Sequence, residues 1–286
     1  EFIDEAALSQ IGSGATFDYN PELVENRPRL LHSIHKATGL IVRNRTQVNT
    51  ELLAAAPQLK VVGRLGVGLD NIDLDACAAR AIAVHPATGA NTLSVAEYVI
   101  TASMMLLRGA FQSRRAMIAG DWPRSALIGG EISGRVMGLL GFGNIARAVA
   151  ERARSLGMTI LAHDPFLAPD DPAWQQFQNC SFSALLANAD VLSLHVPLTQ
   201  ATRNLIDADA LAQMKPSAIL INTARGGIAD ETALAYALRH SKLAGAALDV
   251  FEQEPLTAGA AAKFEGLDNI LLTPHIAGVS TEANIR

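Results

Sequence analysis

Six short apolar segments in the second half of the chain constrain the fold more than any other feature of the sequence. They begin 23 to 32 residues apart, which leaves room for one helix between consecutive segments. Antiparallel hairpins need only about two to five connecting residues, so this spacing favours parallel strands joined by crossover helices. The expected strands are residues 136–140, 159–163, 191–194, 219–222, 246–250 and 270–273.

A similar alternation occupies the beginning of the chain. Three strands are expected at residues 40–43, 61–65 and 82–84, with helices over 50–56 and 74–79 between them. A long helix follows over residues 92–108. The chain of 286 residues is long enough for two domains, each with its own core. We therefore expect an α/β protein with two domains.

The composition excludes several classes of protein. Hydrophobic residues make up 49% of the chain, which rules out disorder, and the net charge of −5 argues against a nucleic-acid partner. The most apolar segment, residues 95–107, contains a glutamate and hydroxyl residues, so no membrane span is expected. Cys77 and Cys180 lack metal-ligand spacing. We expect no metal site and two reduced thiols in a cytoplasmic protein.

A glycine-rich loop joins the first of the six strands to a helical stretch. Residues 141–146 read GFGNIA, where Gly141 and Gly143 would allow a tight turn and close approach of a pyrophosphate. The helix N-terminus offers free N–H groups and a partial positive charge. A purely structural turn would also use glycines. However, Asp164 closes the next strand, at the spacing of the acidic residue that binds the ribose of NAD. That carboxylate would repel the additional phosphate of NADP, so NAD is favoured.

Three consecutive strands are each followed by a side chain suited to chemistry on a 2-oxo acid, namely Arg225, Glu254 and His275. Ligands of open parallel sheets bind beyond the carboxyl ends of the strands. Arginine can bind a carboxylate with two hydrogen bonds, and histidine can protonate a carbonyl oxygen as hydride arrives. A carboxylate beside the histidine orients the ring and favours its protonated form. Each residue alone is better explained as an ordinary surface or loop residue, but the three together, beside the glycine loop, favour a catalytic site.

The first part of the chain adds a candidate substrate site. Gly66, Val67 and Gly68 follow a strand, and the backbone N–H groups of such a turn can hold a small anion. Arg43 and Arg45 follow another strand and are placed to bind a second anionic group. A solvated strand end with paired charges explains these two arginines equally well.

The motifs together resemble the D-2-hydroxyacid dehydrogenase family, which includes phosphoglycerate dehydrogenase. The matching stretches are residues 64–73, 91–97, 138–146, 195–199, 222–227, 249–255 and 273–278. The resemblance implies two Rossmann-like domains with parallel sheets. An NAD-binding domain at residues 91–273 would be inserted into a substrate domain made of residues 1–90 and 274–286. It also implies a homodimer that interconverts a D-configured 2-hydroxy acid and its 2-oxo acid, with NAD as hydride carrier.

The same resemblance implies roles for individual residues. His275 would be the acid–base residue, Glu254 its supporting carboxylate and Arg225 the ligand of the substrate carboxylate, which Gly66–Gly68 would also hold. The expected cofactor contacts are Gly141, Gly143, Asn144, Ile145, Asp164, Val196, Thr223, Asp249 and Gly278. Relatives often have arginine where Asn144 stands, so one phosphate contact is expected to be lost.

The sequence leaves the substrate open. Residues 1–5 and 42–46 are similar to the sulfolactate dehydrogenases of the family, and paired arginines also suit phosphoglycerate. Glyoxylate and hydroxypyruvate are equal rivals. A non-catalytic NAD(H)-sensing protein of the corepressor type, built on the same fold, can retain all three strand-end residues and stays an alternative.

Overall fold

The computed structural model describes residues 1, 3, 8, 14 and 16–286, so most of segment 1–5 lies outside the described residues. The chain divides into two compact units. The smaller unit comprises Glu1–Asn91 and Val279–Arg286, and the larger unit comprises Thr92–Gly278. Residues 274–278, expected in the smaller domain, thus belong to the larger unit. The reason is that Asp249 of the larger unit binds their backbone.

The smaller unit contains a three-stranded parallel sheet in the order β1-β2-β3. Its strands are β1 Gly39–Val42, β2 Val61–Arg64 and β3 Ala83–Pro86. Its helices are α2 Arg27–Ser33, α3 Thr50–Ala55, α4 Leu74–Ala79 and α12 Thr281–Ile285, with 3₁₀ turns η1 Pro21–Glu25 and η2 Ile34–Lys36. Asn49 and Asp73 begin α3 and α4 by accepting backbone N–H groups of the first turn. Val62 and Leu52 are fully buried in its core.

The larger unit contains a seven-stranded parallel sheet in the order β10-β9-β8-β7-β4-β5-β6. Its strands are β4 Val136–Leu140, β5 Thr159–His163, β6 Gln178–Asn179, β7 Val191–Leu194, β8 Ile219–Asn222, β9 Gly245–Leu248 and β10 Ile270–Leu272. The central strand β4 pairs with both β5 and β7, so the chain reverses its direction of winding there. Ligand sites of such sheets lie at this switch point, beyond the carboxyl ends of the strands.

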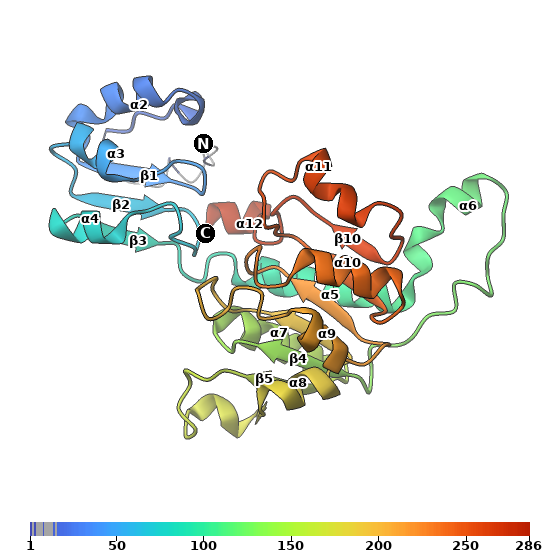
Figure 1. The fold of residues 1–286 in the computed structure, drawn as a ribbon. Helices are drawn as coiled ribbons and strands as arrows, with labels where there is room; N and C mark the ends of the chain where they lie inside the picture. The colour runs from blue at the N-terminus through green and yellow to red at the C-terminus, as the bar shows by residue number, and fades with distance from the viewer. Residues whose placement is uncertain (2, 4–7, 9–13, 15) are drawn as a thin grey trace. The chain divides into compact units, whose positions relative to one another are not determined.

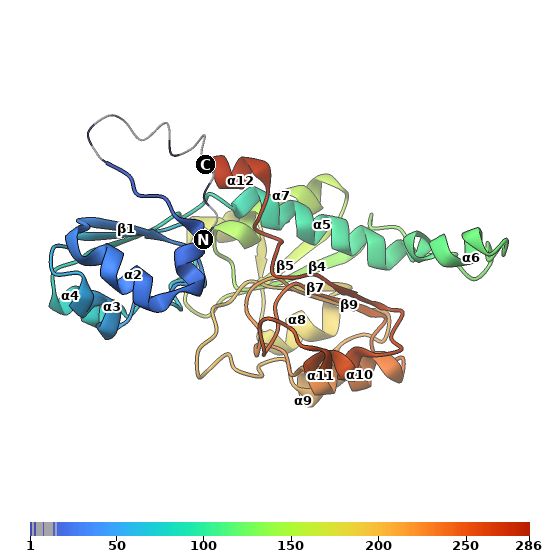
Figure 2. The ribbon, with the colours of Figure 1, turned by 90° about the horizontal axis from the view of Figure 1, so that it is seen from above.

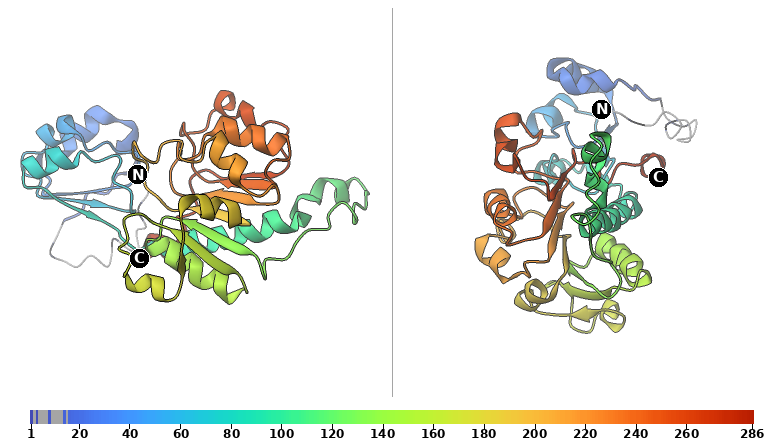
Figure 3. Two further views of the ribbon diagram at one scale, coloured as in Figure 1. Left: turned by 60° about the horizontal axis from the view of Figure 1, so that its bottom comes forward. Right: turned by 90° about the vertical axis from the view of Figure 1, so that its right-hand side faces the viewer.

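Helices cover both faces of this sheet (Figure 3). Successive side chains of a strand point to opposite faces of the sheet, so both faces are apolar and both are covered. On one face, Met137 and Leu139 pack with α5 and α7. On the other face, Leu192 and Leu194 pack with α8, α9 and α10. The helices are α5 Thr92–Arg108, α6 Arg114–Ile118, α7 Asn144–Ser155, α8 Phe182–Asn188, α9 Ala208–Gln213, α10 Glu231–Arg239 and α11 Ala258–Ala261. Three 3₁₀ turns complete the unit: η3 Ala110–Gln112, η4 Pro172–Gln175 and η5 Ala262–Phe264.

An arm made of η3, α6 and the following loop projects from the end of α5, away from the sheet (Figures 1 and 2). Its apolar side chains are exposed, including Phe111, Ile118, Trp122 and Ile128. Neither this arm nor the two-residue strand β6 is among the expected elements, because neither contains a periodic apolar run. Within the described part of the chain, no helix is both long and apolar enough to cross a bilayer.

Candidate active site

The glycine loop lies at the carboxyl end of β4 and leads into α7, as the sequence predicts. Gly141 has φ +86°, and a Cβ there would lie 2.7 Å from His195 O, so both conformation and space require glycine. Gly143 begins α7, and among the described residues no side chain caps that helix end. A Cβ on Gly143 would meet open space. The helix N-terminus, with the amides of Asn144 and Ile145, thus presents unpaired donors suited to a pyrophosphate.

An aromatic cluster packs against the glycine loop through the side chain of Phe142. Phe142 is fully buried and stacks on Trp174 with ring centroids 5.1 Å apart, while Phe177 meets its ring edge-on at 5.3 Å. Arg147 Nε donates to Phe142 O at 3.0 Å, which ties the first turn of α7 to the loop. The residue between the two glycines therefore anchors the loop, and the residues that follow it, Gly143 and Asn144, are exposed.

Asp164 follows β5 and faces the glycine loop. Its Oδ2 accepts the Phe142 N–H and its Oδ1 accepts the Phe166 N–H, both at 2.9 Å. An ionised carboxylate offers about four acceptor positions, so two are left for the ribose hydroxyls of a dinucleotide. The residue predicted from spacing alone thus also fixes the shape of the loop.

The turn after β8 contains a buried hydroxyl group, that of Thr223, which has no hydrogen-bond partner among the described residues. Buried hydroxyls are nearly always paired, so this one fits a partner that arrives with the cofactor. Val196 lies against Gly141, within 3.0 Å of the position a Cβ would take there. These features fit NAD, with Gly141–Ile145 and Asp164 able to hold its pyrophosphate and ribose.

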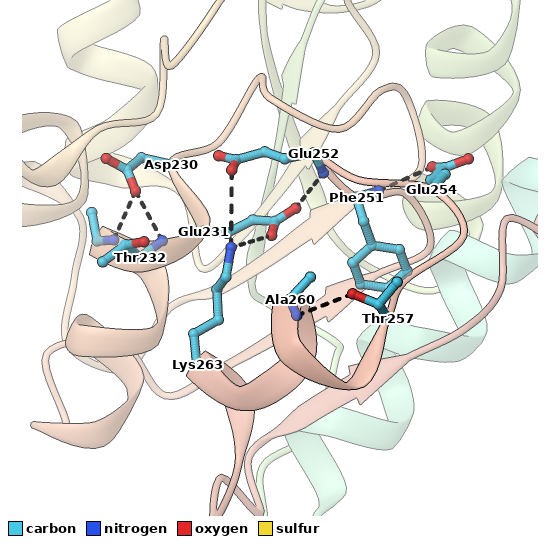
Figure 4. Close-up of polar contacts among 10 residues, drawn as sticks. Asp230, Glu231, Thr232, Phe251, Glu252, Glu254, Thr257, Ala260 and Lys263 are labelled. Atoms are coloured by element: carbon cyan, nitrogen blue, oxygen red, sulfur yellow. Dashed lines mark hydrogen bonds and ion pairs between the residues drawn. The ribbon is translucent and has the colours of Figure 1, made fainter.

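Glu254 and His275 form a hydrogen-bonded pair beyond the ends of β9 and β10. Glu254 Oε2 lies 2.7 Å from His275 Nδ1. Glu254 Oε1 accepts the Phe251 N–H at 3.0 Å (Figure 4). Partial burial opposes ionisation of Glu254. However, His275, the Phe251 N–H and the charge of Arg225 together hold the pKa of this carboxyl below its usual value. An ionised carboxylate can only accept, so Nδ1 carries the hydrogen and Nε2 is left to exchange a proton.

The backbone of His275 is held in an unusual conformation. Its φ is +54°, in the left-handed region that few residues other than glycine adopt. Its N–H donates to Asp249 O at 2.8 Å. Asp249 Oδ1 accepts the Ile276 N–H at 2.9 Å, and Oδ2 accepts the Ala277 N–H at 2.8 Å. The strained loop that carries the histidine is thus fixed by Asp249.

Asp249 is one of the expected cofactor contacts, yet the residue is 1% exposed and its carboxylate is mostly committed to this loop. Oδ1 also accepts Thr273 Oγ1 at 2.6 Å, and the Thr273 hydroxyl in turn lies 2.6 Å from Tyr98 Oη on α5. One acceptor position remains on Oδ2. Gly278 ends the same loop and is half-buried. Tyr98 and Thr273 were missed by the sequence reasoning because nothing local marks a contact between residues so distant in the chain.

Arg225 lies in the turn that follows β8. Asn222, a buried residue to which the sequence reasoning gave no role, shapes this turn: its Nδ2 donates to Arg225 O at 2.9 Å and its Oδ1 accepts the Ala224 N–H at 3.1 Å. Arg225 Nη1 donates to Ala224 O at 2.6 Å. An asparagine at a strand end is a recognisable signal for such a turn. The charge of Arg225 acts on Glu254, which is bonded to His275, so the three predicted strand-end side chains lie near one another.

The predicted substrate turn lies in the smaller unit, after β2. Gly66 has φ +146°, and Arg64 Nη1 lies 1.4 Å from where its Cβ would be, so any side chain would displace the arginine. The turn leaves Val67 exposed, and Gly68 follows it. The Gly66 N–H donates to Arg64 O at 2.9 Å, so the N–H groups of Val67 and Gly68 are the candidate donors to a small anion.

The two predicted tail-binding arginines lie beyond β1 in the same unit. Glu1 Oε2 and Oε1 accept the N–H groups of Arg43 and Arg45, each at 2.8 Å. The Arg45 guanidinium pairs with Glu25 at 2.5 Å, and Arg43 Nη1 donates to Asn284 Oδ1 at 3.3 Å. The two side chains thus have different partners. Within the described residues, no group of three His, Cys, Asp or Glu side chains is placed to hold a metal ion.

Comparison with known proteins decides the family. The family model described as "D-isomer specific 2-hydroxyacid dehydrogenase, NAD binding domain" matches residues 100–277. The chain belongs to this family. It is an NAD-dependent dehydrogenase, and the predicted fold class, cofactor and reaction class are confirmed.

Three members of the family illustrate the range of similarity. The (S)-sulfolactate dehydrogenase of Chromohalobacter salexigens is 55% identical over all of this chain and 92% of its own length. The D-3-phosphoglycerate dehydrogenase of Mycobacterium leprae is 42% identical over 91% of this chain, which spans about half of that protein (49%). The crystal structure of a glyoxylate reductase from Paecilomyes thermophila superposes with a TM-score of 0.85 at 31% identity, covering 99% of this chain and 88% of that one.

Proposed function

We propose that the protein interconverts a D-configured 2-hydroxy acid bearing a second anionic group at C3 with its 2-oxo acid, and that this group is a sulfonate. The single observation that supports the chemistry is the 2.7 Å hydrogen bond between His275 Nδ1 and Glu254 Oε2 at the carboxyl edge of the sheet. The sulfonate is supported by the 55% identity to an (S)-sulfolactate dehydrogenase over the whole chain. Because sulfur outranks the carboxyl group in the naming rules, (S)-sulfolactate has the same spatial arrangement as a D-2-hydroxy acid.

His275 acts as the acid–base residue in this proposal. The bound cofactor would supply the hydride chemistry at C2, as NADH when the 2-oxo acid is reduced and as NAD⁺ when the hydroxy acid is oxidised. In the reductive direction, His275 Nε2 gives a proton to the substrate oxygen and becomes neutral. Glu254 stabilises the protonated ring through Nδ1 and keeps Nε2 directed at the substrate. In the oxidative direction, Nε2 accepts the hydroxyl proton.

Arg225 supplies the positive charge for the substrate. Its guanidinium can bind the C1 carboxylate with two hydrogen bonds and polarise the adjacent carbonyl. Its side chain now contacts its own turn through Ala224 O, so substrate binding would replace that contact. We assign the Gly66–Val67–Gly68 turn to substrate binding, and Arg43 and Arg45 to the sulfonate. The units Glu1–Asn91 with Val279–Arg286 and Thr92–Gly278 would thus be the substrate and cofactor domains.

The test is turnover of purified protein with NADH and four 2-oxo acids: sulfopyruvate, phosphohydroxypyruvate, hydroxypyruvate and glyoxylate. We expect the highest kcat/KM with sulfopyruvate. His275→Ala should lower kcat by about 10² to 10⁴-fold with NADH affinity unchanged. His240→Ala, at an exposed histidine immediately after α10, is the matched control. Arg43→Glu should impair sulfopyruvate far more than glyoxylate.

Each proposal has an outcome that contradicts it. Tight NADH binding without turnover of any 2-oxo acid would favour a cofactor-sensing protein of the corepressor type. Near-normal activity of the His275 variant would contradict the acid–base assignment. Equal losses for sulfopyruvate and glyoxylate in the Arg43 variant would remove that residue from the tail site.

We also infer a cytoplasmic homodimer. The exposed apolar side chains of the arm, Phe111, Ile118, Trp122 and Ile128, support a second copy as the partner that covers them. The cytoplasmic location is supported by the use of NAD, a cofactor kept inside cells. Sedimentation of the Ile118→Asp/Trp122→Ser variant tests the dimer: a mass unchanged from that of the unaltered dimer would contradict this interface.

A further inference from the structure

A buried carboxylate lies behind the catalytic loop, outside the groups assigned above. Glu231 is the first residue of α10, and its side chain is 4% exposed. Its Oε2 accepts from Lys263 Nζ at 2.8 Å, and its Oε1 accepts the backbone N–H of Glu252 at 2.6 Å (Figure 4). Burying an ionised carboxylate is costly unless it is paired and hydrogen-bonded, and here it is both.

The group held by Glu231 belongs to the loop that carries Glu254. The N–H of Glu252 comes immediately after Phe251, whose own N–H donates to Glu254 Oε1. On the other side, Gly226 packs so closely that a Cβ would lie 1.8 Å from Phe251 O. The Phe251–Glu252 peptide is therefore held between the turn that carries Arg225 and the Glu231 carboxylate.

Helix stabilisation alone does not explain this arrangement. An acidic residue in the first turn favours the helix dipole from an exposed position, as Asp209 does on α9. Glu231 instead turns into the protein and bonds a peptide of another loop. Lys263, on η5, also approaches Glu252 Oε2, at 3.9 Å, so it lies between the two carboxylates and offsets part of their charge.

We propose that Glu231, held by Lys263, is a positioning residue for the Glu254–His275 pair: by fixing the Phe251–Glu252 peptide, it sets the carboxylate that orients the imidazole. This inference rests on the proposed function, in which His275 exchanges the proton. Glu231 itself touches neither substrate nor cofactor in this role. Its effect is carried by two hydrogen bonds. The Glu252 N–H donates to Glu231, and the Phe251 N–H donates to Glu254.

The test compares Glu231→Met, which removes the acceptor at similar volume, with Glu231→Gln, which keeps an amide oxygen for the Glu252 N–H. Asp209→Asn, at the first turn of α9, is the matched control. We expect Glu231→Met to slow reduction of the 2-oxo acid roughly tenfold in kcat, as small displacements of catalytic groups do. The midpoint of its kcat–pH profile should move to lower pH, toward that of Glu254→Gln, because the ring loses its oriented carboxylate. Glu231→Gln should recover most of the loss, with NADH affinity within about twofold throughout.

A double-mutant cycle distinguishes a Glu231 that positions Glu254 from a Glu231 that only stabilises the folded protein. If Glu231 acts through Glu254, adding Glu231→Met to Glu254→Gln should cost almost nothing further in kcat. Full additivity, or a lower Tm without any movement of the pH profile, would overturn the inference. If Glu231→Met leaves Lys263 unpaired and fails to fold, Glu231→Met/Lys263→Met removes both charges and is measured in its place. Failure of the proposed function would show separately, as full activity of His275→Ala.

Discussion

Replacing Gly226 by alanine should damage the active site, because the added methyl group would collide with the backbone of the loop that carries Glu254. A Cβ at this position would lie 1.8 Å from Phe251 O and 2.6 Å from Glu252 N, both backbone atoms. Gly226 has an ordinary φ, so the conflict is one of space and not of conformation. Neither backbone atom can rotate away, because both belong to the peptide fixed by the Glu231 carboxylate.

The size of the effect follows from this geometry. Real Cβ atoms stay beyond 3.0 Å from such neighbours, so the loop carrying Arg225 and the loop carrying Glu254 must separate by more than about 1 Å. A misplacement of about 1 Å commonly costs about 10² in rate. Overpacking of this kind also lowers the free energy of unfolding by roughly 1–3 kcal/mol.

The assay is kcat for reduction of the best 2-oxo acid, together with urea unfolding to confirm that Gly226→Ala is folded at the assay temperature. We expect a loss of about 10²-fold in kcat with NADH affinity nearly unchanged. Gly259→Ala is the control, since a Cβ on that α11 glycine meets open space. A folded Gly226→Ala enzyme with near-normal kcat would show that close backbone contact does not set the relative position of the Arg225 loop and the Glu254 loop.

Two further predictions concern the cofactor side of the larger unit. Burial lowers the pKa of His195 to about 4. Between pH 6.5 and pH 4, this histidine is therefore mostly protonated in the unfolded chain and mostly neutral in the folded chain. The free energy of unfolding should therefore fall by about 3 kcal/mol between pH 6.5 and pH 4, a loss that urea titrations of His195→Gln should not show. Asp164→Ala should raise the NADH Kd at least about tenfold, because charged hydrogen bonds to the ribose are lost. The ratio of the NADPH Kd to the NADH Kd should become smaller. Asp170→Ala is its control in fluorescence titrations, and an unchanged preference for NADH would contradict the ribose assignment.

Most strands of the larger sheet were predictable because they are buried on both faces. A parallel strand covered by helices on both sides must be apolar throughout, and β4, β5, β7 and β8 begin and end at the predicted residues. The strand β6 was missed because Gln178 and Asn179 lie at the exposed sheet edge and carry no apolar signal. The expected strands at 246–250 and 270–273 end earlier in the structure, because their last residues turn into the site.

The chemistry of the site was predictable to a similar degree. Parallel strands bring their carboxyl ends to one edge, so an arginine, a glutamate and a histidine after three neighbouring strands were expected to converge. The structure adds the 2.7 Å bond between Glu254 and His275. It also commits the Asp249 carboxylate to the 273–277 loop, a role the sequence reasoning did not assign.

The sequence by itself determined the order of most strands, the glycine loop, its acidic partner and the three strand-end side chains. These features are local, because apolar periodicity, glycine and strand termini act within a few residues. Only the tertiary structure decided how the side chains are held. Glu231 meets Glu252, and Tyr98 meets Thr273, across 21 and 175 residues of chain. Such contacts depend on how loops fold back over the sheet edge and on which buried polar groups must find partners there. No local pattern records either condition.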